Sequence, residues 1–333
     1  MQTVVIKLGA AGDVLRTLPV IKSIKEQHPH SKLVLITKKD ITELLEDVSF
    51  IDVILTVPLT KLPEAELLYN FDIDTEALNL SSAINSAKKL GFYGKEGYPV
   101  AYNIGAEYYL NTIFDDELKR QNKKTYQEMM FESAEIPYKK EGYKLQVNSN
   151  ERERAINFIR KNKIDSARLI GIHMGASSRW PSKVWALQNI KDFIKKASSR
   201  GHPIILFGGP NEIYSHEEIS KELKSEGVHI YHNNPQNTKK EFIALLNQCK
   251  VVVCSDSFAL HVAIGLQKPT IALFFCTSPR EVEGYGLLTK IISPQLYKFF
   301  PERSDVFDKD LVSSISVEQV LEAVEKALSS RYK

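Results

Sequence analysis

The chain has 333 residues, of which 43% are hydrophobic and 26% are charged, and its formal net charge is +3. This length exceeds the size at which one hydrophobic core usually stops growing, so two domains are expected. The small net charge argues against a nucleic-acid partner, because solvated faces explain the lysines gathered early in the chain equally well (Lys22, Lys25, Lys32, Lys38 and Lys39).

No apolar run approaches the roughly 18 consecutive residues that a membrane helix requires. Residues 1–8 read as a strand and lack the features of a signal peptide, so a cytoplasmic protein is expected. Cys249, Cys254 and Cys276 lie on or beside apolar runs and show no CxxC spacing. We therefore expect reduced core cysteines and neither a disulfide framework nor a metal site.

Short β-branched runs alternate with helix-length amphipathic segments, which is typical of a parallel sheet with helices on both faces. In the first half, strands are expected at 3–8, 32–37, 51–56 and 71–78. Leu18, Ile21 and Ile24 have helical spacing between the first two strands. Because a proline is tolerated in the first turn of a helix, Pro19 predicts that this helix begins near Thr17.

The polar, lysine-rich stretch 121–170 predicts the domain boundary, and it contains helical patterns at 125–134 and 151–161. We expect a first domain of 1–150, a second of 151–315 and a terminal helix within 316–333. The second half repeats the alternation, with a helix at 241–248 and strands at 169–173, 203–207, 228–231, 251–254 and 270–274. Ser316 and Gln319 have the spacing of a capping box at the start of the terminal helix.

Ligands of open parallel α/β sheets bind beyond the carboxyl ends of the strands. The loop after the first strand carries Gly9, Gly12 and Asp13, which suit either a ligand site or a helix cap. This loop is not a GxGxxG dinucleotide motif. Thr37, Lys38 and Lys39 also stand where an NAD enzyme would carry an acidic residue, so a dehydrogenase is disfavoured.

The loop after strand 169–173 carries Ser177, Ser178 and Arg179, and Lys183 follows as a second cation. Hydroxyls, free amides and a permanent positive charge are what a diphosphate requires. Trp180 and Trp185 are interpreted as packing anchors.

Two further loops follow strands of the second half. Glu212 stands after 203–207, where it suits either a ribose hydroxyl pair or the start of a helix. After 251–254, the loop and helix start carry Asp256, Ser257, Phe258 and His261. A helix N-terminus there can hold phosphate oxygens, whereas His261 by itself is more often structural.

These loops together resemble glycosyltransferase family nine, the ADP-heptose:lipopolysaccharide heptosyltransferases, over nearly the whole chain. The run Gly12-Asp13-Val14-Leu15-Arg16-Thr17-Leu18-Pro19 resembles the opening motif of the family. The later matches are Arg179-Trp180-Pro181, Gly208-Gly209, Ser255-Asp256 with His261, and Pro269-Thr270.

The resemblance implies a GT-B fold with two facing Rossmann-like domains, the acceptor on the first and the nucleotide sugar on the second. The helix within 316–333 would return to the first domain. Asp13 would be the general base of an inverting, metal-independent transfer, beside Gly9, Gly12 and Arg16 on the acceptor side. Ser177, Ser178, Arg179 and amides after Asp256 would stabilise the leaving diphosphate, and Glu212 would lie beside the ribose.

The implied donor is ADP-heptose, used as a substrate and not as a cofactor. The implied acceptor is a lipid-linked saccharide, reached by peripheral contact with the inner membrane. Two departures put the donor in doubt: Asp256-Ser257-Phe258 stands where the family has Asp-Thr-Gly, and 274–279 departs from Phe-Gly-Pro-Thr. A nucleotide-sugar epimerase of the same fold and a catalytically silent nucleotide-sugar binding protein remain as alternatives.

Overall fold

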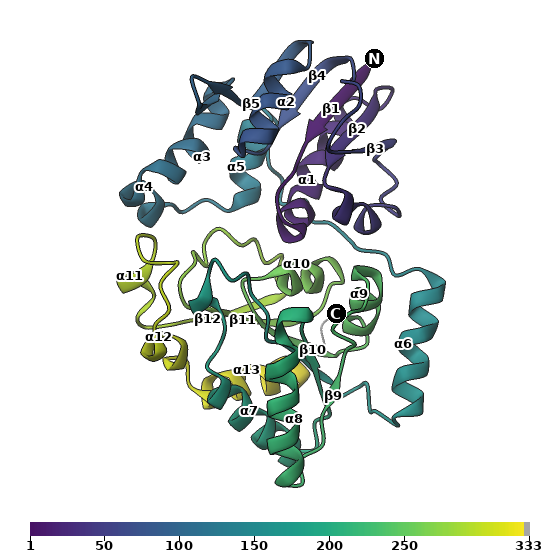
Figure 1. The fold of residues 1–333 in the computed structure, drawn as a ribbon, viewed down its shortest axis with the longest axis vertical. Coiled ribbons are helices and arrows are strands. Elements are labelled where there is room, and N and C mark those ends of the chain that lie inside the picture. The colour runs from purple at the N-terminus through teal and green to yellow at the C-terminus, as the bar shows by residue number, and fades with distance from the viewer. Residues whose placement is uncertain (330–333) are drawn as a thin grey trace. The chain divides into compact units, whose positions relative to one another are not determined.

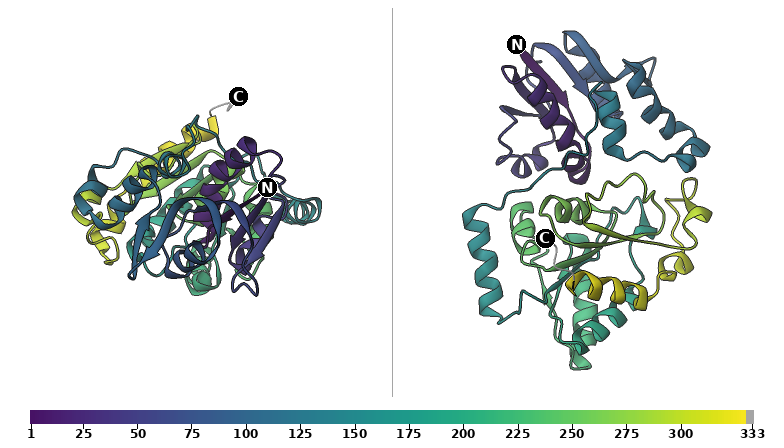
Figure 2. Two further views of the ribbon diagram at one scale, coloured as in Figure 1. Left: turned by 90° about the horizontal axis from the view of Figure 1, so that it is seen from above. Right: turned by 180° about the vertical axis from the view of Figure 1, so that it is seen from behind.

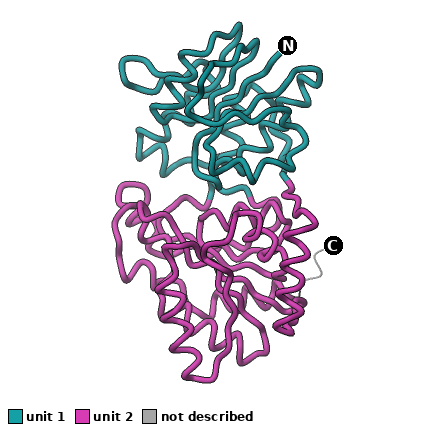
Figure 3. The backbone as a smooth tube through the Cα atoms, turned by 45° about the vertical axis from the view of Figure 1, so that its right-hand side comes forward, with its two compact units in different colours: residues 1–143, 280–283 teal, residues 144–279, 284–333 magenta. Residues whose placement is uncertain are grey.

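A computed structural model describes residues 1–329, which divide into two compact units (Figure 3). The first unit comprises residues 1–143 and 280–283, and the second comprises 144–279 and the chain from residue 284 onward. The boundary therefore lies at 143/144, whereas the sequence places it at 150. Segment 280–283 joins the first unit because the backbone N–H of Tyr126 donates to the carbonyl of Glu281 at 2.9 Å.

The first unit is built on a six-stranded sheet of order β3-β2-β1-β4-β5-β6, parallel except for the β5–β6 pair (Figure 1). Its strands are β1 (Gln2–Ile6), β2 (Lys32–Thr37), β3 (Val53–Thr56), β4 (Ala65–Asn70), β5 (Ser86–Lys95) and β6 (Tyr98–Ala101). The β5–β6 hairpin was not predicted from the sequence. The expected strand at 71–78 is wrong, because Asn70 and Asp72 form a side-chain-bonded turn that ends β4.

The helices of this unit are α1 (Ala11–Gln27), 3₁₀ helix η1 (Lys39–Leu44), α2 (Thr75–Ala83), α3 (Ile104–Phe114), α4 (Asp116–Gln121) and α5 (Tyr126–Ser133). The expected start of the first helix near Thr17 is wrong, since α1 begins at Ala11 and Pro19 lies inside it. An internal proline costs about 3 kcal/mol. Burial of Val14, Leu15 and Leu18 with their neighbours on α1 offsets this cost.

The second unit is built on a parallel sheet of order β12-β11-β10-β7-β8-β9. Its strands are β7 (Ile170–His173), β8 (Ile204–Phe207), β9 (Tyr231–His232), β10 (Val251–Ser255), β11 (Thr270–Phe274) and β12 (Leu288–Ile292). Four of the five expected strands are confirmed; the one expected at 228–231 is the two-residue β9, displaced to 231–232, and β12 was not predicted. The strand order reverses between β7 and β10, and a doubly wound sheet binds its ligand at such a point.

The helices of the second unit are α6 (Ser149–Lys161), η2 (Pro181–Lys183), α7 (Leu187–Ser199), η3 (Pro210–Glu212), α8 (Ile213–Ser225), α9 (Lys239–Leu246), α10 (Phe258–Gly265), α11 (Leu296–Phe299), α12 (Lys309–Ser313) and α13 (Val317–Ser329). One apolar cluster joins α7, α8 and α13 to the strands of the sheet. Cys249, Cys254 and Cys276 are buried and free, as predicted. No helix within residues 1–329 is long and apolar enough to span a bilayer.

The terminal helix α13 packs on other elements of the second unit. Its predicted capping box is present, because the amide of Gln319 donates to the Ser316 hydroxyl and the Gln319 side chain accepts from the Ser316 amide. Within the second unit, α13 lies beside α7 (Figures 1 and 2). Val320, Leu321 and Val324 are buried there, and Glu325 contacts Arg200 and His202 of that unit. The expected return of this helix to the first domain stays a prediction. Residues 330–333 of the predicted segment lie outside the described residues.

Candidate functional site

Asp13 lies just beyond the carboxyl end of β1, in the first turn of α1. Its side chain is 37% exposed. A Cβ atom added to Gly9 would lie 3.1 Å from the Asp13 Cβ, so this position must stay small for the loop to pass so close to the carboxylate. Gly12 is buried in the same turn. The predicted residues of this loop are thus brought together around one accessible carboxylate.

Arg16 and Tyr126 hold Asp13 in place. The Arg16 guanidinium lies 2.7 Å from Asp13 Oδ1 and 3.7 Å from the centre of the Tyr126 ring. The Thr17 hydroxyl donates to the Asp13 carbonyl and lies 3.1 Å from the hydroxyl of Tyr126. Because Tyr126 begins α5, a second helix orients the carboxylate through Arg16. A cation stacked on an aromatic face loses little freedom, so the carboxylate is preorganised.

Lys7 and Asp72 form a buried ion pair beneath the same loop. Lys7 Nζ lies 2.8 Å from Asp72 Oδ1 and donates to the carbonyl of Phe71 at 2.9 Å. Burial alone would lower the pKa of Lys7, but the negative charge of Asp72, with smaller contributions from Tyr126, Asp13 and Tyr109, raises it above its ordinary value. Lys7 is therefore a permanent buried cation near Asp13.

In the second unit, the carboxyl ends of β7 and β10 meet where the strand order reverses. His173 ends β7, and its Nδ1 lies 3.3 Å from the Ser257 hydroxyl, which follows β10. Burial, with the neighbouring His216, lowers the pKa of His173 to about 4. His173 is consequently neutral near pH 7, and its Nδ1 can either donate a hydrogen bond to the Ser257 hydroxyl or accept one from it.

Lys183 and Asp256 provide the charges at this edge. Lys183 Nζ lies 3.3 Å from Asp256 Oδ2, and His261 Nε2 lies 4.0 Å from Asp256 Oδ1. The Lys183 and Asp256 side chains are only 15% and 17% exposed. Ser257 caps α10 without a side-chain hydrogen bond to the helix. The amides of the first turn of α10 thus add partial positive charge beside the lysine, which suits an anion.

Glu212 and Gly175 bring two further loops to the same edge. Glu212 Oε2 accepts a hydrogen bond from the Gly209 amide at 2.7 Å, so the carboxylate caps its own turn. A Cβ atom on Gly175 would lie 3.1 Å from this carboxylate and from the His173 ring. The two interpretations of Glu212 are therefore compatible, because it begins a helix and also faces the loop after β7.

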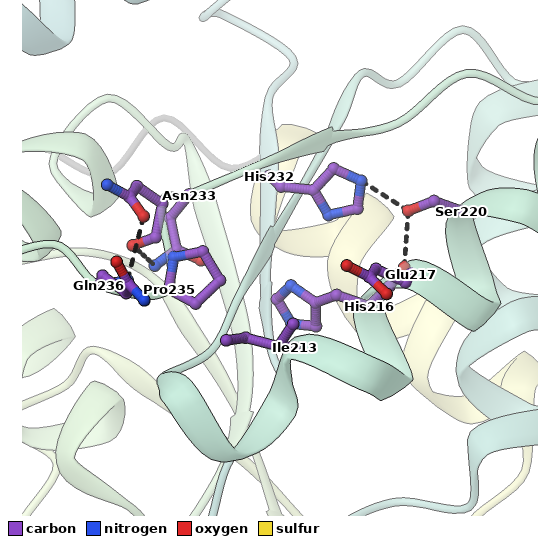
Figure 4. Close-up of a pocket in the computed structure, with 9 residues that line it drawn as sticks. Ile213, His216, Glu217, Ser220, His232, Asn233, Pro235 and Gln236 are labelled. Carbon is purple, nitrogen blue, oxygen red and sulfur yellow. Dashed lines mark hydrogen bonds between the residues drawn. The ribbon is translucent and has the colours of Figure 1, made fainter.

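A pocket of about 550 Å³ lies between α8 and the end of β9 (Figure 4). Its lining is Ile213, His216, Glu217, Ser220, His232, Asn233, Asn234, Pro235 and Gln236. The Ser220 hydroxyl donates to the His216 carbonyl and lies 2.6 Å from His232 Nε2. Since its one proton goes to the carbonyl, Ser220 accepts from His232 Nε2–H, which leaves His232 Nδ1 as an acceptor.

His216 predicts a pH dependence of stability. Burial and the neighbouring His232 lower its pKa from 6.5 to about 4. Between about pH 6.5 and pH 4, His216 is protonated in the unfolded chain but not in the folded chain. The free energy of unfolding therefore decreases as the pH is lowered through this range. We expect His216→Asn to flatten this slope in chemical unfolding measured between about pH 7.5 and pH 4.5. His30→Asn, which alters an exposed histidine of the first unit, is the control. An unchanged slope in His216→Asn would contradict the assignment.

Not every predicted donor residue joins this cluster. Ser177, Ser178 and Arg179 are exposed, and the Arg179 guanidinium lies 5.0 Å from the Trp180 ring. Trp185 is a packing anchor as predicted, since it is buried and donates to the Ile315 carbonyl. Trp180 is different, because it remains partly exposed beneath Arg179 and Lys183.

Phe258, the first residue of α10, is half-buried. Its ring packs on Phe242 of α9 with centroids 5.6 Å apart, and Phe242 in turn packs on His173. The bulky side chain is therefore accommodated by an aromatic cluster between α9 and α10.

The model of glycosyltransferase family 9 (heptosyltransferase) matches residues 80–306, which is well over half of the chain. The chain belongs to this family. The resemblance read from the sequence motifs is thereby confirmed.

Individual relatives agree with the family. Lipopolysaccharide heptosyltransferase 2 of Salmonella typhimurium is 31% identical over 110 residues, which cover 33% of this chain and 30% of that protein. The chain thus aligns with about a third of the length of that relative. A family 9 glycosyltransferase structure from Veillonella parvula has a TM-score of 0.79 at 18% identity, covering 98% of this chain and 97% of that one. The structure of ADP-heptose lps heptosyltransferase II from E. coli has a TM-score of 0.71 at 18% identity and covers 98% of both chains. These two structures establish the predicted GT-B fold.

Sequence reasoning missed Lys7, Asp72, Tyr126 and the histidines of the pocket. Lys7 carried a signal, because it is a lysine inside an otherwise apolar run. Asp72 gave no such signal, because residues 71–78 have the pattern of a strand. Within residues 1–329, no cluster of three or more His, Cys, Asp or Glu side chains is placed to hold a metal ion. The expectation of metal-independent chemistry stays a prediction.

Proposed function

We propose that this protein is an inverting glycosyltransferase that moves a heptose from ADP-heptose to a hydroxyl of a lipopolysaccharide or related acceptor. The observation that carries the proposal is Asp13, held by Arg16 at the carboxyl end of β1 in a chain of family 9. The first unit would bind the acceptor, and the second would bind the donor. The lipid-linked acceptor would be reached from the cytoplasmic side by peripheral contact.

In the proposed reaction, Asp13 removes the proton of the acceptor hydroxyl as its oxygen bonds to the anomeric carbon. The bond from that carbon to the diphosphate breaks on the opposite face, and the electron pair leaves on ADP. A positioned base contributes about 10²- to 10⁴-fold, so much of the barrier must be lowered at the leaving group. Lys183 and the amides at the start of α10 are suited to stabilise that charge.

The second unit has features that suit the nucleoside. Glu212 offers a carboxylate to a ribose hydroxyl pair. The pocket that begins at Ile213, the residue after Glu212, offers the polar side chains of Asn234 and Gln236 to a base, with Ile213 and Pro235 as apolar walls. We therefore propose that the base of the donor enters this pocket. Competition by ADP, but not by inorganic pyrophosphate, for a fluorescent adenosine ligand would support this assignment.

The test of the function is an assay with ADP-heptose in the presence and absence of a heptose-deficient lipopolysaccharide. If the protein is a glycosyltransferase, ADP and the extended acceptor should form together and only when the acceptor is present. Mass spectrometry of the acceptor measures the added sugar. Turnover of ADP-heptose without an acceptor would instead support the epimerase. Binding of ADP-heptose without turnover under either condition would support a silent binding protein.

Arg179→Ala is expected to weaken both donor binding and transfer, but by no more than about fivefold. Arg179 is exposed, and an exposed ion pair is worth about 0.2–1 kcal/mol. Calorimetry with ADP and initial rates with ADP-heptose measure the two effects. Arg168→Ala, which alters another arginine of the second unit, is the control. If Arg179→Ala instead lowered the affinity for ADP by a hundredfold or more, residues 177–179 would have to close over the donor when it binds.

A further inference from the structure

Asp72 is the hydrogen-bonding centre of the loop that leads to Asp13. Its Oδ2 accepts from the amides of Leu8 at 2.5 Å and Gly9 at 2.9 Å, while Oδ1 pairs with Lys7 at 2.8 Å. Leu8 and Gly9 belong to the connection between β1 and α1. One carboxylate from the end of β4 therefore fixes the path of this connection.

We propose that Asp72 is a positioning residue for glycosyl transfer, which acts by fixing the Leu8–Gly9 backbone on which the orientation of Asp13 depends. Lys7 in turn holds the carboxylate of Asp72. This inference rests on the proposed function, because it takes Asp13 as the general base. Under this inference, Lys7 and Asp72 affect the rate of transfer without touching the substrate.

Gly9 is the point at which Asp72 and Asp13 meet. A Cβ atom on Gly9 would lie 3.4 Å from Asp13 Oδ2 and 3.5 Å from Asp72 Oδ1. Ala10, the N-cap of α1, makes no side-chain hydrogen bond to the helix. Since the cap contributes no side-chain hydrogen bond, the bonds that Asp72 accepts from the Leu8 and Gly9 amides hold the backbone directly before α1. A displacement of the Gly9 backbone would be passed to Asp13 directly.

Asp72 is itself held rigidly. The Asn70 side chain accepts from the Asp72 amide at 3.0 Å and donates to the carbonyls of Asp72 and Phe92 at 2.9 and 2.8 Å. These bonds tie Asp72 to the end of β4 and to β5. The Asp72 side chain is only 11% exposed. A buried, fully bonded carboxylate of this kind is able to transmit the rigidity of the sheet to a loop.

The unit contains a similar but more exposed ion pair at the opposite end of α1. Asp52 Oδ2 accepts from Lys25 Nζ at 2.7 Å and from the Leu33 amide at 2.6 Å. Leu33 lies at the start of β2, whereas Asp13 lies beyond the end of β1. The two sites share a lysine, a carboxylate and a backbone amide. If the Lys7–Asp72 pair served stability alone, its removal should change the transfer rate no more than removal of the Lys25–Asp52 pair does.

The experiment compares two double variants, because removal of one partner would leave a buried charge unpaired. Lys7→Met/Asp72→Leu removes both charges and the acceptor of the two amides. Lys7→Met/Asp72→Asn removes both charges but keeps an oxygen for those amides. We expect the first to lower kcat by about tenfold or more, because a misplaced catalytic group loses rate, and the second to recover most of this loss. The Kd for ADP should stay unchanged in both, and Lys25→Met/Asp52→Leu should keep the wild-type kcat.

Asp72→Glu keeps the charge for Lys7 but displaces the amide acceptor, so it tests the inference if a double variant does not fold. Its kcat should also fall while its Kd for ADP stays constant. A kcat near the wild-type value in folded Lys7→Met/Asp72→Leu or in Asp72→Glu would overturn the inference, as would a parallel loss of ADP affinity. If the wild type itself transfers no sugar, the proposed function fails instead.

Discussion

Asp13→Asn is expected to lower the rate of heptosyl transfer by about 10²- to 10⁴-fold while the Kd for ADP stays within a few-fold. The amide keeps the shape of the side chain and an oxygen for Arg16, which lies 2.7 Å from Asp13 Oδ1 in the native protein. It cannot accept the proton of the acceptor hydroxyl. Single-turnover rates with ADP-heptose and a heptose-deficient lipopolysaccharide measure the chemical step directly.

Glu26→Gln is the matched control, because Glu26 forms an exposed ion pair with Lys22 near the other end of α1. It should leave the rate unchanged. Asp13→Ala should behave as Asp13→Asn does, although its Arg16 partner is then released. Near wild-type transfer by either Asp13 variant would show that another group accepts the proton, even if the family assignment is right.

The alternation of strands and helices was readable because it depends on local periodicity. The parallel strands of the second unit are short apolar runs with clear boundaries, and four of the five predicted ones match closely. The errors arose where tertiary contacts override local preference. Pro19 lies within α1 because the helix buries a long apolar face. The amphipathic face of α13 identifies a helix that must dock but not the surface that receives it.

The candidate site was predictable to the extent that its residues follow strands directly. Asp13, Glu212 and Asp256 each stand just beyond a strand end, where ligands of open sheets bind. The pairings within the site could not be read in this way. Lys183 reaches Asp256 across 73 residues, and Lys7 reaches Asp72 across 65. Such contacts depend on the order of strands in the sheet, which single-sequence periodicity does not reveal.

Lys183→Met is expected to weaken ADP binding by roughly 10- to 100-fold, because a hydrogen bond to a charged group contributes about 1.5–3 kcal/mol. The side chain is 15% exposed and lies beside the start of α10, so its charge is little screened by solvent. The transfer rate should also fall, since the same charge would stabilise the departing diphosphate. Calorimetry with ADP and with adenosine separates the phosphate contribution, because adenosine affinity should change little.

Lys191→Met provides the control for loss of a lysine, since Lys191 pairs with Glu222 at 2.7 Å and is 10% exposed in the same unit. It should leave ADP binding unchanged. Lys183→Met also leaves Asp256 without its lysine, so part of any effect could come from the carboxylate. The double variant Lys183→Met/Asp256→Asn removes that charge as well. If ADP affinity returned to the wild-type value in the double variant, Lys183 would serve only to neutralise Asp256, and the diphosphate would be bound by the α10 amides alone.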